Sequence, residues 1–320
     1  MINTFRSLLL LAACLVAQAG FSQVSPAGDA SRRSEGVPFR SANATVLRTD
    51  AMMEEKPGDE FVGFAPASAG DRDIGDQMIL RERERKSDFS FNADAFLFWT
   101  NNAAHVAQGE QGDTFLGLRA EAAWMPRIVG NLFGGVSVSQ DWVRYDRFDA
   151  LDFETFQVTP GIAYVEPRLG NTSFYAQYQY ERLTHDWKEL MNRHAVRAGI
   201  VKTWVFNRRS SIDTGVMGSW DFDNDVDSLR RNEYAVTAAW RFKITHKLEM
   251  ALQYSYTFFD YTELDRQDHL HVVGLSFDWR IRKWLSAYAY LSYAFNDSNL
   301  DVYDYQAANL GGGIGLRLKF

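Results

Sequence analysis

The sequence predicts an all-β fold: a closed antiparallel transmembrane β-barrel of about 12 strands, preceded by a largely unstructured N-terminal segment. Three observations support this prediction. Segments after residue 87 alternate apolar and polar residues, their connections alternate in length, and no apolar run beyond the N-terminus approaches the roughly 20 residues of a membrane helix. The composition agrees, because 46% hydrophobic residues coexist with a mean hydropathy of -0.30. A barrel has this property because every second strand residue faces the lumen instead of lipid.

The expected strands are each near the roughly 9 to 11 residues that cross a bilayer at a tilt. They are Phe89 to Thr100, Thr114 to Trp124, Leu132 to Tyr145, Thr155 to Val165, Ser173 to Glu181, His194 to Phe206, Ser211 to Trp220, Tyr234 to Ile244, Leu248 to Phe259, His269 to Arg280, Leu285 to Phe295 and Gln306 to Phe320.

The connections between these segments predict the orientation of the barrel. Short turns occur at residues 126–131, 167–171, 207–210, 245–247 and 281–283, whereas the intervening connections are longer and more acidic. Outer-membrane barrels have short periplasmic turns and longer external loops. An even number of strands then places both ends of the barrel on the turn side.

Tryptophan placement distinguishes a membrane barrel from a soluble sandwich, which would show the same alternation. By strict alternation the outward tryptophans fall near strand ends, as expected for girdles at the headgroup level. They are Trp99, Trp142 and Trp220 at the loop side and Trp124, Trp204, Trp240 and Trp279 at the turn side. Lys202 is an exception, because alternation aims it at lipid, and either a bulge or snorkelling would accommodate it.

The last twelve residues end an alternating strand on an aromatic residue. In this respect the chain resembles bacterial outer-membrane β-barrel proteins, whose closing strand ends in Phe. The resemblance implies that the insertion machinery reads Phe320 together with Ile314, Leu316 and Leu318. It also implies localisation in the cell outer membrane, with outer-membrane lipid and the barrel insertion machinery as partners.

The N-terminus has the features of an export signal. A basic start, an apolar stretch and Ala17-Gln18-Ala19 predict a secretory signal peptide over residues 1–19. The alternative is lipidation of Cys14, because Leu11-Ala12-Ala13-Cys14 fits a lipoprotein processing box. Residues 20–86 form a flexible periplasmic segment by composition, being rich in proline and charge. A solvated linker, a plug in the lumen and a docking segment for a periplasmic partner all remain open. Residues 87–320 form the barrel.

Inward strand positions carry the residues that we expect to line the lumen. These are Asp94, Arg119, Glu121, Asp141, Glu181, Arg197, Asp213, Arg241, Lys243, Glu249, Asp278, Arg280, Arg317 and Lys319. Bases gather towards the turn side, where a charged zone would favour anions. The alternative is that the inward acids and bases pair with one another and with inward glutamines, and that this hydrogen-bonded network fills the barrel without any flow. Inward glycines such as Gly117 and Gly199 favour open space, with close backbone approach as the alternative.

Three classes of function follow from this pattern. The first is a channel for small hydrophilic solutes. The second is a structural or partner-binding barrel with a filled lumen. The third, a membrane hydrolase like the twelve-stranded outer-membrane phospholipases, lacks support because the chain contains no His-x-Ser pair. We therefore expect no enzyme activity, no cofactor, no metal and no nucleic-acid partner. The acidic run from Asp221 to Asp227 lacks the glycine and closing glutamate of an EF-hand.

Overall fold

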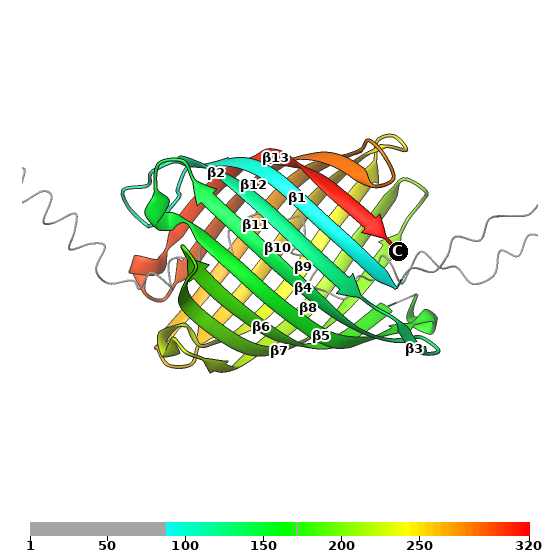
Figure 1. Cartoon of the computed structure of the whole chain (residues 1–320), viewed down its shortest axis with the longest axis horizontal. Helices are drawn as coiled ribbons and strands as arrows, with labels where there is room; N and C mark the ends of the chain where they lie inside the picture. The colour runs from blue at the N-terminus through cyan, green and yellow to red at the C-terminus, as the bar shows by residue number, and fades with distance from the viewer. Residues whose placement is uncertain (1–87, 171) are drawn as a thin grey trace, which may run out of the picture.

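The computed structural model describes residues 88–170 and 172–320 (Figure 1). The signal peptide, Cys14 and the segment up to residue 86 lie outside these described residues. Among the described residues, no helix has the length and apolar character needed to cross a bilayer.

The described chain forms twelve long antiparallel strands and one short one. The long strands are β1 (Phe89–Thr100), β2 (Asp113–Trp124), β4 (Leu132–Tyr145), β5 (Phe153–Glu166), β6 (Thr172–His185), β7 (Lys188–Val205), β8 (Ser210–Asn224), β9 (Arg231–Lys243), β10 (Leu248–Tyr261), β11 (Arg266–Arg280), β12 (Leu285–Ser298) and β13 (Tyr305–Lys319). The short strand β3 (Arg127–Val129) extends the turn before β4.

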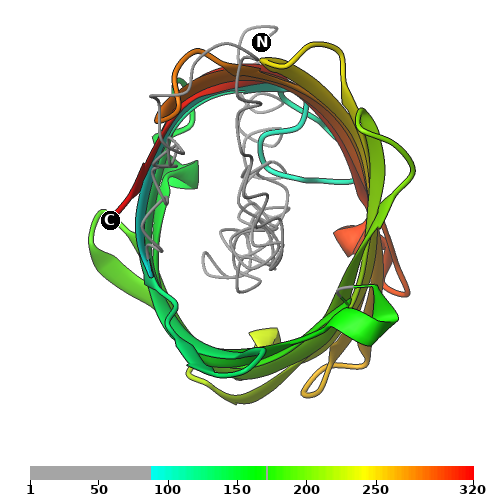
Figure 2. The same ribbon diagram turned by 90° about the vertical axis from the view of Figure 1, so that its right-hand side faces the viewer.

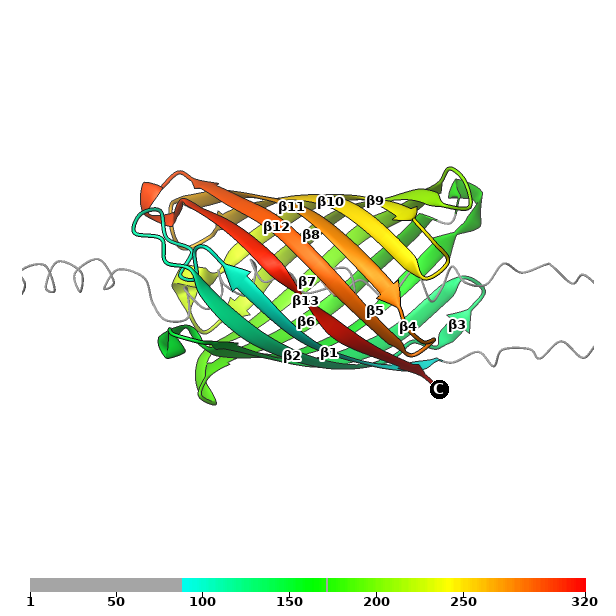
Figure 3. The ribbon, with the colours of Figure 1, turned by 90° about the horizontal axis from the view of Figure 1, so that it is seen from above.

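The sheet closes on itself through β1, which pairs with β2 on one edge and with β13 on the other. Each remaining long strand pairs with its neighbours in chain order, so the twelve-stranded ring has no edge (Figures 2 and 3). Closure satisfies the backbone hydrogen bonds that an open sheet would expose to lipid. The predicted closed antiparallel barrel is confirmed.

The strands reach further on the loop side than the sequence pattern predicts. The sequence pattern predicts a long loop between residues 181 and 194, and this prediction is wrong. Strands β6 and β7 continue to His185 and from Lys188, joined by Asp186 and Trp187. Both turn residues have positive φ, 48° and 64°, as a two-residue hairpin turn requires. Pairing therefore continues beyond the segment that alternation identifies.

The outer surface of the barrel is apolar and bordered by aromatic residues. On β2, for example, Leu116 and Leu118 are half exposed, whereas Phe115 and Arg119 on alternate positions are buried. All nine tryptophans of the sequence lie in the described residues, and none is buried. Successive residues of a strand point to opposite faces, so the buried set faces the lumen and the exposed apolar set faces lipid.

Three histidines lie in the loop-side aromatic girdle on the outer surface. The Nδ1 atoms of His194, His269 and His271 lie 2.6, 2.8 and 2.9 Å from the hydroxyls of Tyr178, Tyr256 and Tyr254, respectively. Each of these tyrosines belongs to a neighbouring strand. These three Tyr–His pairs thus join polar atoms across neighbouring strands, which lowers the cost of placing the polar atoms against lipid.

Lys202 lies on the outward face of β7 without a bulge, since its pairing with Thr214 is regular. Its Nζ lies 3.8 Å from the centre of the Trp204 ring, two residues nearer the turn side. The ammonium therefore reaches towards the headgroup level along the barrel surface, which is the snorkelling alternative.

Candidate functional site

The lumen is the candidate site, and every predicted lining residue lies on an inward position of its strand. They separate into three groups. Asp94, Arg119, Glu121, Asp141 and Glu181 lie on β1 to β6, Arg197 lies on β7, and the others lie towards the turn ends of β8 to β13. This last group contains Asp213, Arg241, Lys243, Glu249, Asp278, Arg280, Arg317 and Lys319.

The first group centres on Arg119, whose side chain is buried. Its guanidinium lies 3.2 Å from the carboxylate of Asp141 on β4 and 3.5 Å from that of Glu121 on its own strand. Asp94 on β1 faces Arg119 in register. On β6, the Glu181 carboxylate accepts hydrogen bonds of 2.8 Å from the amides of Gln157 and Gln179. This wall of the lumen carries more acids than bases.

The second group is larger than the sequence predicts. Arg197 belongs to an arginine cluster that we define as Arg193, Arg197, Arg231, Asp221 and Glu233, on β7, β8 and β9. Arg193 donates to Asp221 at 2.8 Å and to Glu233 at 2.6 Å. Arg231 donates to Glu233 at 3.1 Å, and Arg197 lies 3.5 Å from the same carboxylate. Three guanidinium groups share two carboxylates, so the cluster has a net positive charge.

Four members of the arginine cluster are absent from the predicted lining set because the predicted strands ended too early. Two of the predicted strands begin at His194 and Tyr234, and a third ends at Trp220, whereas the observed strands β7, β8 and β9 extend past these residues. A signal was present in the sequence. Arg193 precedes the inward Arg197 by four residues, and Arg231 and Glu233 precede the inward Ala235 by four and two. Asp221 follows the inward Ser219 by two residues, so each of the four missing residues continues the inward period of two.

The third group brings bases and acids together at the turn end of the lumen. Asp213 forms an ion pair of 2.6 Å with Arg241 and accepts a hydrogen bond of 2.6 Å from the Thr203 hydroxyl. Glu249 faces Lys243 on one side and Asp278 on the other. Arg280, Arg317 and Lys319 lie on inward positions at the open rim and are exposed. Bases outnumber acids in this group, five to three, which gives the turn-side mouth a positive charge.

Inward aromatic rings lie against glycines of the neighbouring strand. Phe96 and Gly117 are opposite in register, and a Cβ on Gly117 would overlap the Phe96 ring. The same relation joins Tyr175 to Gly199, Phe98 to Gly311 and Tyr288 to Gly313. Tyr290 lies diagonally from Gly274, and a Cβ there would also meet the Tyr290 side chain. The expectation that inward glycines leave open space is therefore wrong at these positions. The glycines instead let rings lie along the wall, an arrangement known as aromatic rescue.

The loop-side mouth contains a hydrophobic cluster within the ring of strands. Phe98, Phe115 and Leu183 from three strands form it together with Ala103 of the β1–β2 connection and Leu229 of the β8–β9 connection. Figure 2 shows the β1–β2 connection extending to the inside of the barrel.

Two contacts hold the β1–β2 connection in that place. The Asn102 amide donates to the carbonyls of Val106 and Gln306, each at 2.8 Å. The His105 ring stacks on Tyr305 of β13 at 4.7 Å. The connection therefore narrows the loop-side mouth from within.

A metal site is not formed by the described residues. Among residues 88–170 and 172–320, no group of three or more His, Cys, Asp or Glu side chains is arranged to hold a metal ion.

Sequence comparisons find no matching family model and no matching curated protein. The fold is similar to that of an outer-membrane channel from Pseudomonas putida F1, with a TM-score of 0.54 and 12% sequence identity over 72% of this chain and 96% of that chain. The β-domain of the Bordetella autotransporter BrkA gives a TM-score of 0.46 at 10% identity, over 72% of this chain and 99% of that one. The translocator domain of the autotransporter NalP from Neisseria meningitidis gives 0.42 at 12% identity, over 73% and 90%.

The closed twelve-stranded ring and its apolar exterior give the chain the fold of an outer-membrane β-barrel, in agreement with the similarity in fold to the channel. This fold and the apolar exterior support the expected location in the bacterial outer membrane.

Proposed function

We propose that this barrel is a channel for small hydrophilic solutes. The observation that carries the proposal is the polar lining. Charged and amide side chains continue around the inward face from β2 to β9, while the outward face is apolar. Charged groups along a lumen lower the cost of moving hydrated solutes and ions through a bilayer. The inward rings support the same function, because rings that lie over Gly117 and Gly199 take less space from the lumen.

The dimensions of the ring set the size of the solute. Twelve strands spaced about 4.7 Å apart and tilted by about 40° close into a backbone cylinder roughly 23 Å across, leaving on the order of 10 Å once side chains project inward. Such a lumen admits a small solute and excludes a folded protein.

A structural or partner-binding barrel with a filled lumen is the second candidate. This second candidate is favoured because many charged lining residues form ion pairs and hydrogen bonds with one another. Arg193 and Glu233 are buried and joined at 2.6 Å, and the loop-side hydrophobic cluster closes part of the mouth. Buried charges generally need such partners for stability alone.

Single-channel recording in planar bilayers separates the two candidates. The purified protein is recorded with residues 20–86 present and with them deleted. The channel proposal predicts discrete conductance steps in at least the shorter protein, and steps only after deletion would identify residues 20–86 as a plug. Silence in both proteins, each shown to be folded by its heat-dependent electrophoretic mobility, would contradict the channel and favour the filled barrel.

A further inference from the structure

The inward face of β4, β5 and β6 contains buried polar atoms that have no hydrogen-bond partner among residues 88–170 and 172–320. They are Asp141 Oδ1, Thr155 Oγ1, Ser173 Oγ, Gln177 Oε1 and Gln179 Oε1. Each of these five residues is at most 4% exposed. Buried polar atoms almost always have a partner. We therefore expect a further group to contact this part of the lumen, which we call the β6 wall and define as these five residues together with Glu181.

The β6 wall presents its acceptors in a row. Gln177, Gln179 and Glu181 occupy alternate positions of β6, so they lie on one face at a spacing of about 6.7 Å. Asp141 and Thr155 face each other across β4 and β5. Guanidinium and ammonium groups are the donors that suit carboxylate and amide oxygens. In the part of the chain that the structure describes, these oxygens do not converge as metal ligands do. The ligand that fits is an extended cation with several donors.

The sequence directly before β1 contains such a cation. Residues 81–86 read Arg-Glu-Arg-Glu-Arg-Lys, with four bases and two acids. In an extended backbone the three arginines project to one side at the same spacing of about 6.7 Å, and the two glutamates project to the other side. The donors of residues 81–86 and the acceptors of the β6 wall therefore repeat with the same period.

The lumen beside the β6 wall is complementary to the two glutamates. Gln177 lies opposite Arg197 of β7 in register, and Glu181 lies opposite Arg193. These arginines belong to the arginine cluster, in which three guanidinium groups share two carboxylates. The Arg197 side chain is 16% exposed and that of Arg193 only 6%, so Arg197 is the more accessible of the two. An alternating segment along the boundary of β6 and β7 would direct arginines to one side and glutamates to the other.

Residues 81–86 are close enough in the chain to reach the β6 wall from the turn side. The described chain begins at Asp88, beside the turn end of β1. The seven residues 81–87 span up to about 23–25 Å when extended. This length matches the backbone cylinder of roughly 23 Å. The segment can therefore cross the lumen from β1 to β6.

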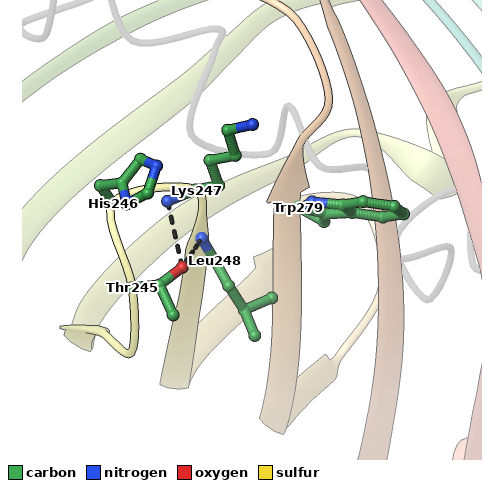
Figure 4. A pocket seen from close by; sticks show the side chains of 5 residues that line it. All are labelled: Thr245, His246, Lys247, Leu248 and Trp279. Atoms are coloured by element: carbon green, nitrogen blue, oxygen red, sulfur yellow. Dashed lines mark hydrogen bonds between the residues drawn. The ribbon is translucent and has the colours of Figure 1, made fainter.

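The connection between β9 and β10 shows how short the turn-side rim is. The Thr245 hydroxyl accepts from the backbone N–H of Lys247 at 3.2 Å and of Leu248 at 3.0 Å (Figure 4). The Arg280 N–H donates to the Lys247 carbonyl at 2.7 Å. This turn is thus held at the rim, whereas the β1–β2 connection extends into the barrel at the loop side (Figure 2).

We propose that residues 81–86 bind the β6 wall inside the lumen. The arginines donate to the oxygens of Asp141, Gln177, Gln179 and Glu181, and the glutamates face Arg197. The unpartnered acceptors and the charge of the wall carry this inference. It concerns the attachment of the segment, and it holds for a conducting and for a filled lumen alike.

Limited proteolysis of the purified full chain in detergent tests the proposal. Trypsin cleaves after arginine and is too large for a lumen of on the order of 10 Å. Mass spectrometry gives the rate at each bond relative to the same bond in a free peptide of residues 41–90. We expect this relative rate to be at least about tenfold lower after Arg81, Arg83 and Arg85 than after Arg48, because cleavage follows the unbound fraction. Equal relative rates at the four arginines would overturn the proposal.

The double variant Asp141→Asn with Glu181→Gln removes two negative charges from the β6 wall and should abolish the protection. The matched control is Asp213→Asn with Glu249→Gln, which removes two inward carboxylates at the turn end of the lumen, outside the β6 wall. This control should keep the protection. Heat-dependent electrophoretic mobility shows that both variants are folded. Equal protection in the two folded variants would contradict binding to the β6 wall.

A second variant leaves the barrel sequence unchanged, so its effect does not come from misfolding of the barrel. Arg81→Gln with Arg83→Gln and Arg85→Gln should expose the segment to a protease that cleaves after glutamate. Cuts after Glu82 and Glu84 should then be rapid in the variant and slow in the unmodified chain. Slow cuts in both would show that the arginines do not hold the segment.

Spermidine tests the other source of an extended cation, a soluble one. Its binding to the unmodified protein and to the Asp141→Asn, Glu181→Gln variant is measured by calorimetry. Binding that only the unmodified protein shows, together with free cleavage at residues 81–86, would assign the β6 wall to a soluble cation and overturn the proposal. We expect instead that the bound segment excludes spermidine from the wall.

Discussion

Phe96 and Gly117 face each other across β1 and β2, and the phenyl ring fills the place where a side chain of residue 117 would begin. Gly117→Val should therefore push this ring away from the wall and into the lumen. We expect a smaller single-channel conductance and a loss of about 1–3 kcal/mol in the free energy of unfolding, as in other overpacked sites. Conductance steps in planar bilayers and urea unfolding in vesicles measure the two effects.

The control for this substitution is the double variant Phe96→Ala with Gly117→Val. Removing the ring makes room for the new side chain, so conductance should recover although the hydrophobic cluster loses a member. An unchanged conductance in the single variant would show that the ring of Phe96 does not border the conducting path.

Glu233 is the residue on which the arginine cluster depends, since its carboxylate lies within 3.5 Å of guanidinium groups from Arg193, Arg231 and Arg197. Glu233→Gln leaves those buried charges with fewer partners. Breaking a buried ion pair in this way costs about 3–5 kcal/mol of stability. Equilibrium unfolding of the refolded barrel in vesicles is the measurement.

Glu249→Gln provides the comparison for Glu233, because Glu249 is also an inward glutamate but is only partly buried at the turn end of β10. Its substitution should change the stability by no more than about 0.5 kcal/mol. Equal destabilisation by the two substitutions would mean that the buried cluster has no special part in holding the barrel together.

The exposed bases Arg317 and Lys319 lie at the turn-side mouth of the lumen, where bases outnumber acids. Charged rings set the selectivity of a pore. The double variant Arg317→Gln with Lys319→Gln should therefore lower the permeability of chloride relative to potassium, seen as a shift of the reversal potential in a salt gradient. Arg282→Gln with Lys283→Gln removes the same charge from the β11–β12 turn and should have a smaller effect. If the two double variants shifted the reversal potential equally, the lumen bases Arg317 and Lys319 would have no special part in ion selectivity.

The C-terminal Phe320 closes the barrel beside the first strand. Its backbone N–H donates to the Phe89 carbonyl at 3.0 Å, and the two rings lie 5.9 Å apart. If the insertion machinery reads this residue, Phe320→Ala should lower the amount of protein in the outer membrane while the purified variant still refolds in detergent. Immunoblots of membrane fractions, combined with heat-dependent mobility on gels, measure both. A normal amount in the membrane would argue against Phe320 as an insertion signal.

Strand number, facing and closure are predictable from the sequence because they rest on a period of two and on lipid contact. Leu248 and Glu249 point to opposite faces in any strand, whatever their neighbours are. Where the strands extend beyond the bilayer on the loop side, the alternation of apolar and polar residues is lost, because both faces of the sheet contact water or polar groups. The turn at Asp186 and Trp187 illustrates the loss: Asp186 suits the first position of a two-residue hairpin turn, but Trp187 stands where a glycine usually marks the second. The expected strands accordingly stop short there.

The contacts inside the lumen are less predictable, because they depend on register between strands. The sequence shows that Phe96 and Gly117 both face inward, but only the pairing of β1 with β2 places the ring over the glycine. Likewise Arg193 and Glu233 are 40 residues apart in the chain, and their ion pair depends on the pairings through β8. Composition and alternation do not contain this information.

Cysteine accessibility on β10 tests the central claim, a water-accessible lumen inside a lipid-covered wall. Ser255→Cys places a thiol on an inward position and Leu252→Cys places one on an outward position, both in a Cys14→Ser background. In vesicles, a charged thiol reagent should modify the first and leave the second unmodified. Equal reaction of both thiols, or reaction of the inward thiol only after unfolding, would contradict this account.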